Sequence, residues 1–397
     1  MTARGGTSPV LIAGGGIGGL SAAIALSRRG FRVTLLERSA FAEESGAGIQ
    51  LGPNATRALR QLGTLDAIEA QAFRPEAIWL FDAISGKRLA TMPLGDRVEE
   101  RYGAPYLTLH RADLHAGLLQ LCQSHASIEL KSDFEVTGVE ERDAGITACA
   151  ADGRSAEGSM LIGADGLWSS LRARAAPGAM PRFAGQTAWR ALLPRAQAPS
   201  PYDAPVVGLW LGPGAHLVHY PVRGGKDLNL VAVVEGGEPA HGWNQQGDRA
   251  ALLANFARWA EPPQSLLNMA ESWRVWSLHR LRPLPRWSAG RITLLGDAAH
   301  PVLPFLAQGA ALAIEDAVAL AASLDACGGD RALAFPRYEA LRRKRAEQVQ
   351  RAAEQYGRLY HLGGPARLLR NLLLERRRGV TLLNGFDWLY AVESRTG

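Results

Sequence analysis

The sequence predicts an α/β protein with a Rossmann-like nucleotide-binding domain, an inserted antiparallel-sheet domain and C-terminal helices. Three observations lead to this fold class. A glycine-rich loop lies between a buried apolar run at 10–13 and an alanine-rich helical stretch at 20–29. Between 181 and 275, tryptophan, proline and paired glycines punctuate short strand-like segments, as in an antiparallel sheet. The region 336–397 is largely helical and basic.

Each glycine of the loop has a mechanical reason. Gly14 allows the tight turn, Gly16 lets the backbone approach a pyrophosphate, and Gly19 lets helix and strand pack closely. The N-terminus of the helix expected at 20–29 offers free N–H groups to phosphates. Glu37 ends the next strand, about 20 residues on, where a carboxylate accepts from a ribose hydroxyl. The pattern predicts a dinucleotide site but not which dinucleotide, and glycines that serve only chain packing are the alternative.

The composition is that of an ordinary globular protein, with 47% hydrophobic and 21% charged residues among 397. No run approaches the ~18 apolar residues of a membrane span, and the first apolar run is already the nucleotide strand, so we expect no membrane partner and no signal peptide. Three distant cysteines predict reduced thiols, no metal site and a cytoplasmic location. Basic runs at 342–345 and 376–378 contribute to the net charge of +6. Without a recognised nucleic-acid module, they indicate solvated helix faces rather than nucleic-acid binding.

Strand and turn signals divide the chain into six segments. The strand and helix pattern assigns 1–75, 109–180 and 276–335 to the nucleotide-binding domain. The strands of 76–108 leave this domain and join the substrate domain at 181–275, and the C-terminal helical region is 336–397. No second glycine fingerprint follows a strand, which argues against a two-fingerprint flavin reductase.

Two further buried strands end in an aspartate next to glycine, at Asp165 and Asp297. Asp297 at a strand end can accept hydrogen bonds from a polyol, although a turn or helix-capping role is the commoner one for a lone aspartate. Gly309 and Ala310 open the next helix, whose N-terminal dipole favours negative charge such as that of a reduced flavin.

With these motifs the chain resembles the class A flavoprotein monooxygenases, the aromatic hydroxylases with the 4-hydroxybenzoate hydroxylase fold. It is most similar to the branch of salicylate, 3-hydroxybenzoate 6- and 6-hydroxynicotinate hydroxylases. Three ordered motifs carry the family resemblance: Gly14-x-Gly16-x-x-Gly19, Gly163-Ala-Asp165-Gly166 and Gly296-Asp297-Ala-Ala-His300-Pro301. The branch motifs are Gly46-Ala-Gly48-Ile-Gln50, Ala188-Trp189-Arg190-Ala191, Pro304-Phe-Leu-Ala-Gln308-Gly309, Glu315-Asp316-Ala317 and Phe386-Asp387-Trp388-Leu389-Tyr390.

The resemblance implies an FAD cofactor with its adenosine on the glycine loop and Glu37, close to Arg38. It implies that Arg111 and Asp297 hold the middle of the flavin and that Asp165 serves both FAD and a transient NAD(P)H. The remaining residues expected at the cofactor are Ile17, Gly48, Gln50, Gly309 and Ala310.

The reaction implied is hydroxylation of a small phenolic or hydroxypyridine-type ring, expected to be carboxylated. NAD(P)H reduces the flavin, O2 adds to give a C4a-hydroperoxide, and its distal oxygen passes to the ring. The alternatives are an oxidase or reductase on the same fold and a non-catalytic, FAD-stabilised binding protein. The substrate, NADH or NADPH, decarboxylative hydroxylation, and a monomeric or homodimeric state stay open.

The expected substrate pocket lies on the strand-like segment 215–221. Side chains alternate on a strand, so His216 and Tyr220 share a face while His219 points away. In the resembling branch, a histidine and a tyrosine at this spacing line the pocket, with a glutamine at the position of Gln308. We expect His216 to accept a phenolic proton, Tyr220 to orient the substrate and Gln308 to bond its hydroxyl. A purely structural strand histidine is the alternative.

Three other positions carry weaker expectations. Arg190 either packs on the sheet or meets an anion, a carboxylate or an NAD(P)H phosphate, and the two are equally weighted. His300 is expected to shape its loop. Arg280-Leu281 departs from an Asp-Arg pair common in the family, which puts in doubt an ion pair near the flavin but not the fold.

Overall fold

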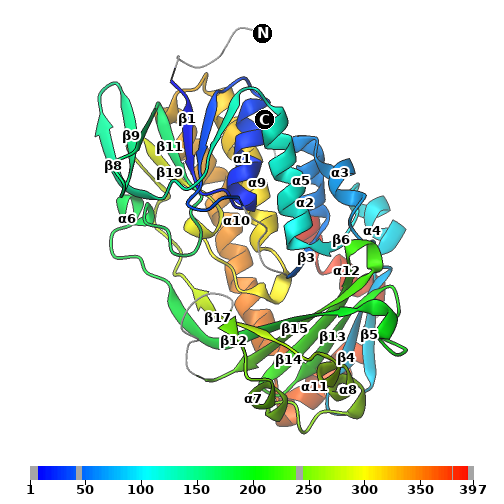
Figure 1. Ribbon diagram of the computed structural model, residues 1–397. Helices are drawn as coiled ribbons and strands as arrows, with labels where there is room; N and C mark the ends of the chain where they lie inside the picture. Colours follow the sequence, from blue (N-terminus) through cyan, green and yellow to red (C-terminus); the bar gives the residue numbers. More distant parts are fainter. Residues whose placement is uncertain (1–7, 42–46, 238–244, 378, 392–397) are drawn as a thin grey trace.

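The computed structural model describes residues 8–41, 47–237, 245–377 and 379–391 (Figure 1). Gly46 of the 46–50 motif lies outside them. The described chain forms a six-stranded sheet, an eight-stranded sheet and two small sheets. A long helix in the C-terminal region runs from the part with the six-stranded sheet to the part with the eight-stranded sheet. The α/β prediction is confirmed.

The six-stranded sheet carries the glycine loop. Its order is β18 (Ser288–Ala289), β19 (Ile292–Leu294), β11 (Met160–Gly163), β1 (Val10–Ala13), β2 (Val33–Leu36) and β7 (Ile128–Lys131). All neighbours pair in parallel except β18 and β19. Ala13 is level with Gly163, and Gly163 with Leu294. The loops that follow β1, β11 and β19 therefore leave the same edge of the sheet, which is where ligands bind in such folds.

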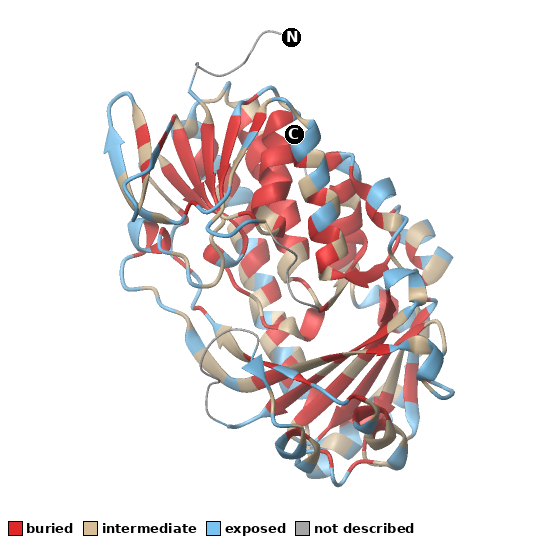
Figure 2. Ribbon diagram, in the orientation of Figure 1, coloured by how far each residue is buried: buried red, intermediate tan, exposed pale blue. Residues whose placement is uncertain are grey.

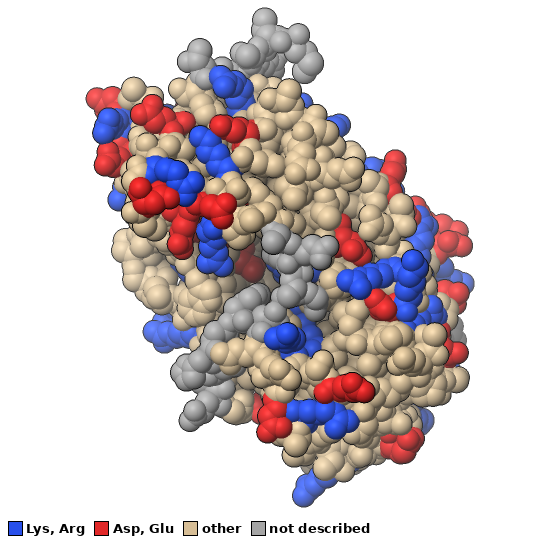
Figure 3. All heavy atoms as spheres, in the orientation of Figure 1, with Lys and Arg blue, Asp and Glu red and all other residues tan. Residues whose placement is uncertain are grey.

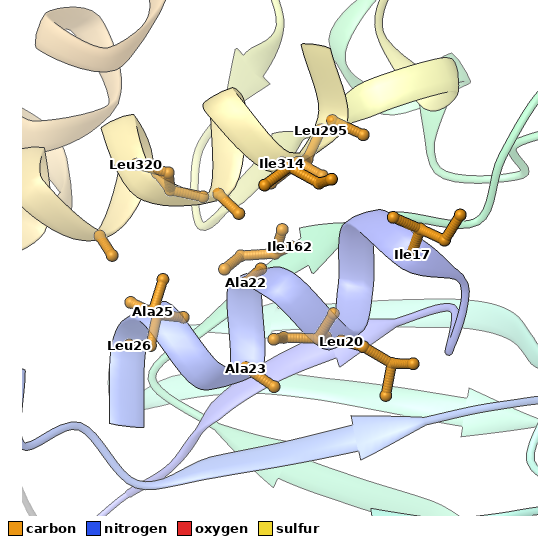
Figure 4. Close-up of a cluster of buried hydrophobic side chains, with 14 of the residues drawn as sticks. Ile17, Leu20, Ala22, Ala23, Ala25, Leu26, Ile162, Leu295, Ile314 and Leu320 are labelled. Carbon is orange, nitrogen blue, oxygen red and sulfur yellow. The ribbon is translucent and has the colours of Figure 1, made fainter. Parts of the chain in front are cut away.

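Helix α1 (Ile17–Ser27) lies between this sheet and helix α9 (Gly309–Ala326), as Figure 4 shows. Its alanines are short enough for the two helices to approach closely, and Ala22, Ala23 and Ala25 are each at most 1% exposed. The other helices of this part are α2 (Pro53–Leu62), α3 (Leu65–Glu69), α5 (Arg111–Ser124) and α6 (Arg172–Ala175). Figure 2 shows that burial is continuous from the sheet through α1 to α9.

Two small sheets flank this core. One contains β8 (Val136–Arg142), β9 (Gly145–Ala150) and β10 (Ser155–Gly158). The other pairs β3 (Gly48–Leu51) with β6 (Leu107–His110).

The eight-stranded sheet has the order β16 (Gln245–Gln246), β17 (Arg274–Arg280), β12 (Arg182–Pro194), β15 (Asp227–Glu235), β14 (Ala215–Val222), β13 (Val206–Gly212), β4 (Ala77–Asp82) and β5 (Arg88–Pro93). Its pairs are antiparallel except for β4 with β13. One face packs on α7 (Arg249–Ala254) and α8 (Glu261–Met269) through Trp210, Leu217 and Leu266. The other face lies toward the 3-10 turn η4 (Pro304–Leu306) and the C-terminal helices.

Within 76–108, helix α4 (Gly95–Tyr102) occupies a stretch that we expected to be strand. Gly95 and Gly103 are conspicuous there as turn signals, but Gly103 in fact caps the helix in the left-handed conformation, with φ 70°. A helix-capping glycine and a turn glycine look alike in a sequence.

The C-terminal helices are α10 (Arg331–Tyr360), α11 (Gly364–Glu375), α12 (Gly379–Asn384) and α13 (Asp387–Tyr390). The interpretation of 342–345 as a solvated face is wrong for two of its residues, because Arg342 and Arg345 are buried against α9. On the face drawn in Figure 3, basic and acidic side chains intermingle. In the described ranges no helix has the length and apolarity to cross a bilayer, and no cluster of three or more His, Cys, Asp or Glu side chains suits a metal. The remaining 3-10 turns are η1 (Arg195–Gln197), η2 (Arg223–Gly225) and η3 (Gly296–Ala298).

Candidate active site

The glycine loop is closed by a carboxylate. The Gly15 N–H donates to Oε2 of Glu37 at 2.6 Å, and Ser39 donates to Oε1 through its N–H and hydroxyl at 2.9 and 2.8 Å. A carboxylate has about four acceptor sites, so Glu37 retains capacity for a ribose hydroxyl. Arg38, next along, is exposed.

The glycines themselves are under different constraints. A side chain on Gly19 would collide with the backbone of Gly14, and Gly14 has φ +106°. A Cβ on Gly16, by contrast, would meet no atom within 4 Å. Open space in front of Gly16, beside the N-terminus of α1 at Ile17, is what an approaching pyrophosphate requires.

Arg172 holds together the two aspartate turns at the sheet edge. Its Nε donates to the Ala298 carbonyl at 2.8 Å, and its Nη2 donates to the carbonyls of Leu167 at 2.8 Å and Asp297 at 3.1 Å. Burial lowers the pKa of Arg172, against the charges of Asp165 and Asp297. Arg172 stands outside every sequence motif, so no pattern in the sequence indicates its role.

Each aspartate has an oxygen or a whole carboxylate left for a ligand. Oδ2 of Asp165 accepts from the N–H of Ser170 at 2.9 Å, while its Oδ1 is buried without a partner in the described chain. Burial raises the pKa of Asp297, against the charges of His300, Arg111 and Arg172, and yet its side chain is exposed. The Asp297 carboxylate is therefore open to a ligand while protein charges lie close to it.

Helix α9 begins beside this carboxylate. A Cβ built on Gly309 would lie 4.0 Å from Oδ1 of Asp297, and the side chain of the N-cap residue Gln308 does not cap the first N–H groups of the helix, which include that of Ala310. The N-terminus of α9 therefore presents its positive dipole end next to Asp297 and Arg111. The open glycine, the unpaired Asp165 oxygen and this helix end fit an extended cofactor with a pyrophosphate, a polyol and an electron-accepting ring.

A buried ion-pair cluster supports the Asp297 turn from the protein interior. Oδ2 of Asp316 accepts from His300 Nε2 at 2.6 Å and from the Gly296 N–H at 3.1 Å, and its Oδ1 accepts from Arg342 at 2.7 Å. Glu315 accepts from Arg345 Nε at 2.6 Å and pairs with Arg342 at 2.7 Å. His300 thus bonds Asp316 inside this cluster, as expected of a residue that shapes its loop.

His216 lies on the face of β14 that is directed toward η4 and α10. Its ring is 3% exposed and packs against Phe305 and Tyr360, at centroid distances of 5.5 and 5.4 Å. Nδ1 of His216 lies 2.7 Å from Nε2 of His361, which leaves Nε2 of His216 as the ring nitrogen for a ligand. Burial lowers the pKa of His216 well below its usual value, with a smaller effect from His361, so the ring is a neutral base.

Tyr220 shares that face and meets the two-stranded sheet. A Cβ on Gly48 would contact both Tyr220 and Asn229, and the Gly48 N–H donates to Oδ1 of Asn229 at 2.7 Å. Gln50 lies in the same region and accepts from the Tyr106 hydroxyl at 2.7 Å. Burial raises the pKa of Tyr220, and Arg190 and a hydrogen bond with Gln50 oppose this rise. The strand β3 thus carries the expected cofactor residues to the junction with the substrate sheet.

His219 points the other way, as alternation requires. It lies against Tyr202 at a centroid distance of 5.2 Å, and neither ring nitrogen has a partner in the described chain. Burial lowers its pKa to about 3.

Gln308 makes two hydrogen bonds within the nucleotide-binding part. Its Oε1 accepts from Asn54 Nδ2 at 2.9 Å and its Nε2 donates to the Leu306 carbonyl at 3.3 Å. Each polar atom thus has one partner, and an amide keeps a second N–H donor and a second acceptor site for a substrate hydroxyl. Its substrate role stays a prediction.

Arg190 packs on the sheet, and its contact with an anion stays a prediction. Its guanidinium lies over the Trp276 ring at 4.8 Å, while its buried Nε has no hydrogen-bond partner in the described chain. Burial lowers its pKa, and the charges that act on it are those of Tyr220 and Arg111. At the departure from the family pattern, Arg280 is exposed and Leu281 is in the main core.

Comparison with known proteins identifies the architecture. Residues 7–353 match the family model described as an FAD binding domain. The chain is 37% identical to 3-hydroxybenzoate 6-hydroxylase of Klebsiella oxytoca over 382 residues, covering 96% of both proteins. It is 37% identical to 6-hydroxynicotinate 3-monooxygenase of Bordetella bronchiseptica, covering 88% of this chain and 91% of that one.

A solved salicylate hydroxylase substrate complex superposes with a TM-score of 0.83 at 25% identity, over 98% of this chain and 96% of that chain. The predicted branch is confirmed by these three similarities, and the residues at the sheet edge suit the cofactor. The chain belongs to the FAD-binding family of aromatic-ring monooxygenases.

Proposed function

We propose that this enzyme uses NAD(P)H and O2 to hydroxylate a small phenolic or hydroxypyridine-type aromatic acid. The observation that carries the proposal is His216, a buried imidazole whose Nδ1 is held by His361 and whose Nε2 is therefore the nitrogen turned to a ligand. A neutral ring nitrogen in a dry site is suited to accept a phenolic proton. Removing that proton makes the aromatic ring more electron-rich and so more reactive toward an oxygen electrophile.

The chain's own residues divide the remaining work. Gly16, Asp165, Asp297 and Arg111 hold FAD, which when bound accepts a hydride and activates O2. Phe305 and Tyr360 exclude water from the ring of His216. Tyr220 orients the substrate from the other end of the same face of β14.

A carboxylate on the substrate is supported by charge. Arg190 and Arg111 bring two positive charges to the region of Tyr220, and the buried Nε of Arg190 lacks a partner among the described residues. A buried guanidinium is strongly stabilised by a carboxylate in the bidentate geometry. We infer further that the enzyme is cytoplasmic, because its three cysteines are free thiols, and that it acts as a monomer or homodimer.

The test is a panel of hydroxybenzoates and hydroxypyridine carboxylates. NADH and NADPH oxidation by the FAD-loaded enzyme is followed with each acid, and hydroxylated product and H2O2 are quantified together. A hydroxylase oxidises the nicotinamide faster with its substrate and yields product in step with the nicotinamide consumed. Equal oxidation with and without every acid, with H2O2 alone, would instead identify an oxidase or reductase on the same fold.

His216→Asn separates the base from the scaffold. Asparagine retains a hydrogen-bonding group but accepts no proton, so kcat for the active acid should fall by roughly 10²-fold, with KM less affected. His219→Asn is the matched control, because His219 lies on the same strand and faces away. Equal rates for the wild type and His216→Asn would remove His216 from the mechanism.

A further inference from the structure

Three side chains form a continuous hydrogen-bonded path that leads away from the substrate side of His216. Nδ1 of His216 lies 2.7 Å from Nε2 of His361, and Nδ1 of His361 lies 2.7 Å from Oε1 of Glu235. The three residues come from β14, the C-terminal cap of α10 and the end of β15. Both distances are those of ordinary strong hydrogen bonds.

The path runs from the interior to the surface. His216 and His361 are 3% and 7% exposed, whereas the side chain of Glu235 is 48% exposed. Backbone contacts fix the outer part, because the Gly214 N–H donates to the His361 carbonyl at 3.1 Å and the Glu235 N–H donates to the Gly214 carbonyl at 2.8 Å. These bonds hold the backbones of His361 and Glu235 close together, so that their side chains can meet.

The protonation states suit transfer. Burial lowers the pKa of His361, with Glu235 opposing and Arg370 adding to the effect, and burial likewise lowers the pKa of His216. Two neutral imidazoles can each carry a proton on Nδ1 and leave Nε2 free to accept. In that arrangement His216 donates to His361, and His361 donates to the Glu235 carboxylate.

The other polar groups around the path are otherwise engaged. The Tyr360 hydroxyl donates to the Phe305 carbonyl at 3.2 Å, and burial raises its pKa, so it is not a competing acid. Arg370 donates to Oδ1 of Asn371 at 2.9 Å and lies 3.7 Å from a carboxylate oxygen of Asp82.

We propose that His361 and Glu235 carry the phenolic proton of the bound substrate from His216 to solvent. The phenol O–H breaks as an N–H forms at Nε2 of His216, and the Nδ1–H of His216 passes to Nε2 of His361. The Nδ1–H of His361 then passes to Glu235, which releases a proton to water. The substrate is left as a phenolate, no electrons are exchanged, and His361 and Glu235 act through His216 as positioning and relay residues.

This proposal rests on the proposed function, and its test measures protons rather than turnover. FAD-loaded enzyme is mixed with 3-hydroxybenzoate, or with the acid identified in the panel, in weak buffer with a pH indicator, below the pKa of the free phenol. The wild type should release a proton as the phenol binds. His361→Gln keeps a donor and an acceptor but conducts no proton, so release should slow by roughly 10²-fold.

Two further variants keep the result independent of folding. Glu235→Gln changes a half-exposed side chain and should also slow release. His361→Ala leaves a space beside His216, and added imidazole should restore its release rate, which a purely structural defect would not allow. His219→Gln, the same change on the opposite face of β14, should match the wild type.

Unchanged release rates in both His361→Gln and Glu235→Gln would overturn the relay and leave the hydroxylase proposal intact. Binding of the phenol without proton release in the wild type would overturn it as well. Normal release without hydroxylated product would overturn the proposed function alone.

Discussion

Replacing Asp316 by Asn should destabilise the enzyme far more than loss of one surface charge. The carboxylate of Asp316 is fully buried and accepts from the Gly296 N–H, His300 Nε2 and Arg342 Nε. An asparagine of the same shape directs an NH2 group at one of these donors and leaves Arg342 with Glu315 alone.

Removing one partner from a buried ion pair costs about 3–5 kcal/mol. Because Arg342 keeps its 2.7 Å contact with Glu315, the lower end of about 3 kcal/mol applies. With an unfolding entropy of ~2.1 cal/mol/K per residue over 397 residues, this loss lowers Tm by about 4 °C. FAD should also bind more weakly, because Asp316 holds the N–H of the residue before Asp297.

Thermal unfolding of the FAD-loaded protein and fluorescence titration of the apoprotein with FAD measure the two effects. The control is Glu140→Gln, which breaks the ion pair of Glu140 with Arg142, whose side chains are 58% and 72% exposed. Such a surface pair contributes less than about 1 kcal/mol. Equal Tm losses in the two variants would refute the view that the buried cluster supports the cofactor turn.

Two other outcomes are expected. Gly16→Val should fold with a normal Tm as apoprotein but bind FAD poorly, because its side chain enters space that no described protein atom occupies; absorbance of the purified protein at flavin wavelengths checks this, and normal FAD content would place the pyrophosphate elsewhere. Stability should fall in acid. Burial raises the pKa of Glu315 and of Asp316, but the neighbouring positive charges outweigh it and lower each pKa to about 2. These charges are Arg342 and Arg345 at Glu315, and His300 and Arg342 at Asp316. The folded carboxylates thus bind protons more weakly than the unfolded ones, so this stabilisation is complete above about pH 5 and is lost as pH falls toward 2; Tm measured against pH should show a shallower acid decline in Asp316→Asn than in the wild type.

The parts of the site that a sequence reveals are those set by the backbone. Gly14, Gly16 and Gly19 are recognisable because a tight turn and a close approach tolerate no side chain, and Asp165 and Asp297 because they end buried parallel strands. Parallel pairing alone brings these three loops to one edge, so their convergence could be expected.

Side-chain pairings between distant elements could not be expected in the same way. His361 is 145 residues from His216 in sequence, and nothing around it marks it as a partner. Arg342 and Arg345 have the appearance of a basic helix face, and only the tertiary contact with Glu315 buries them. Gln308 is a further case, since its motif indicates a substrate contact but nothing in the sequence indicates its hydrogen bond from Asn54, 254 residues away.

The length of helix α10 sets the distance between the two ends of the active site. Arg345, which pairs with Glu315 of the buried cluster, and His361, at the substrate sheet, are separated by a span that a helix covers in about 24 Å. One residue inserted between them would advance that span by only ~1.5 Å but rotate everything beyond it by about 100°. The register of this single helix therefore decides whether His361 meets His216, and a change of helix length uncouples the two ends without altering a residue at either.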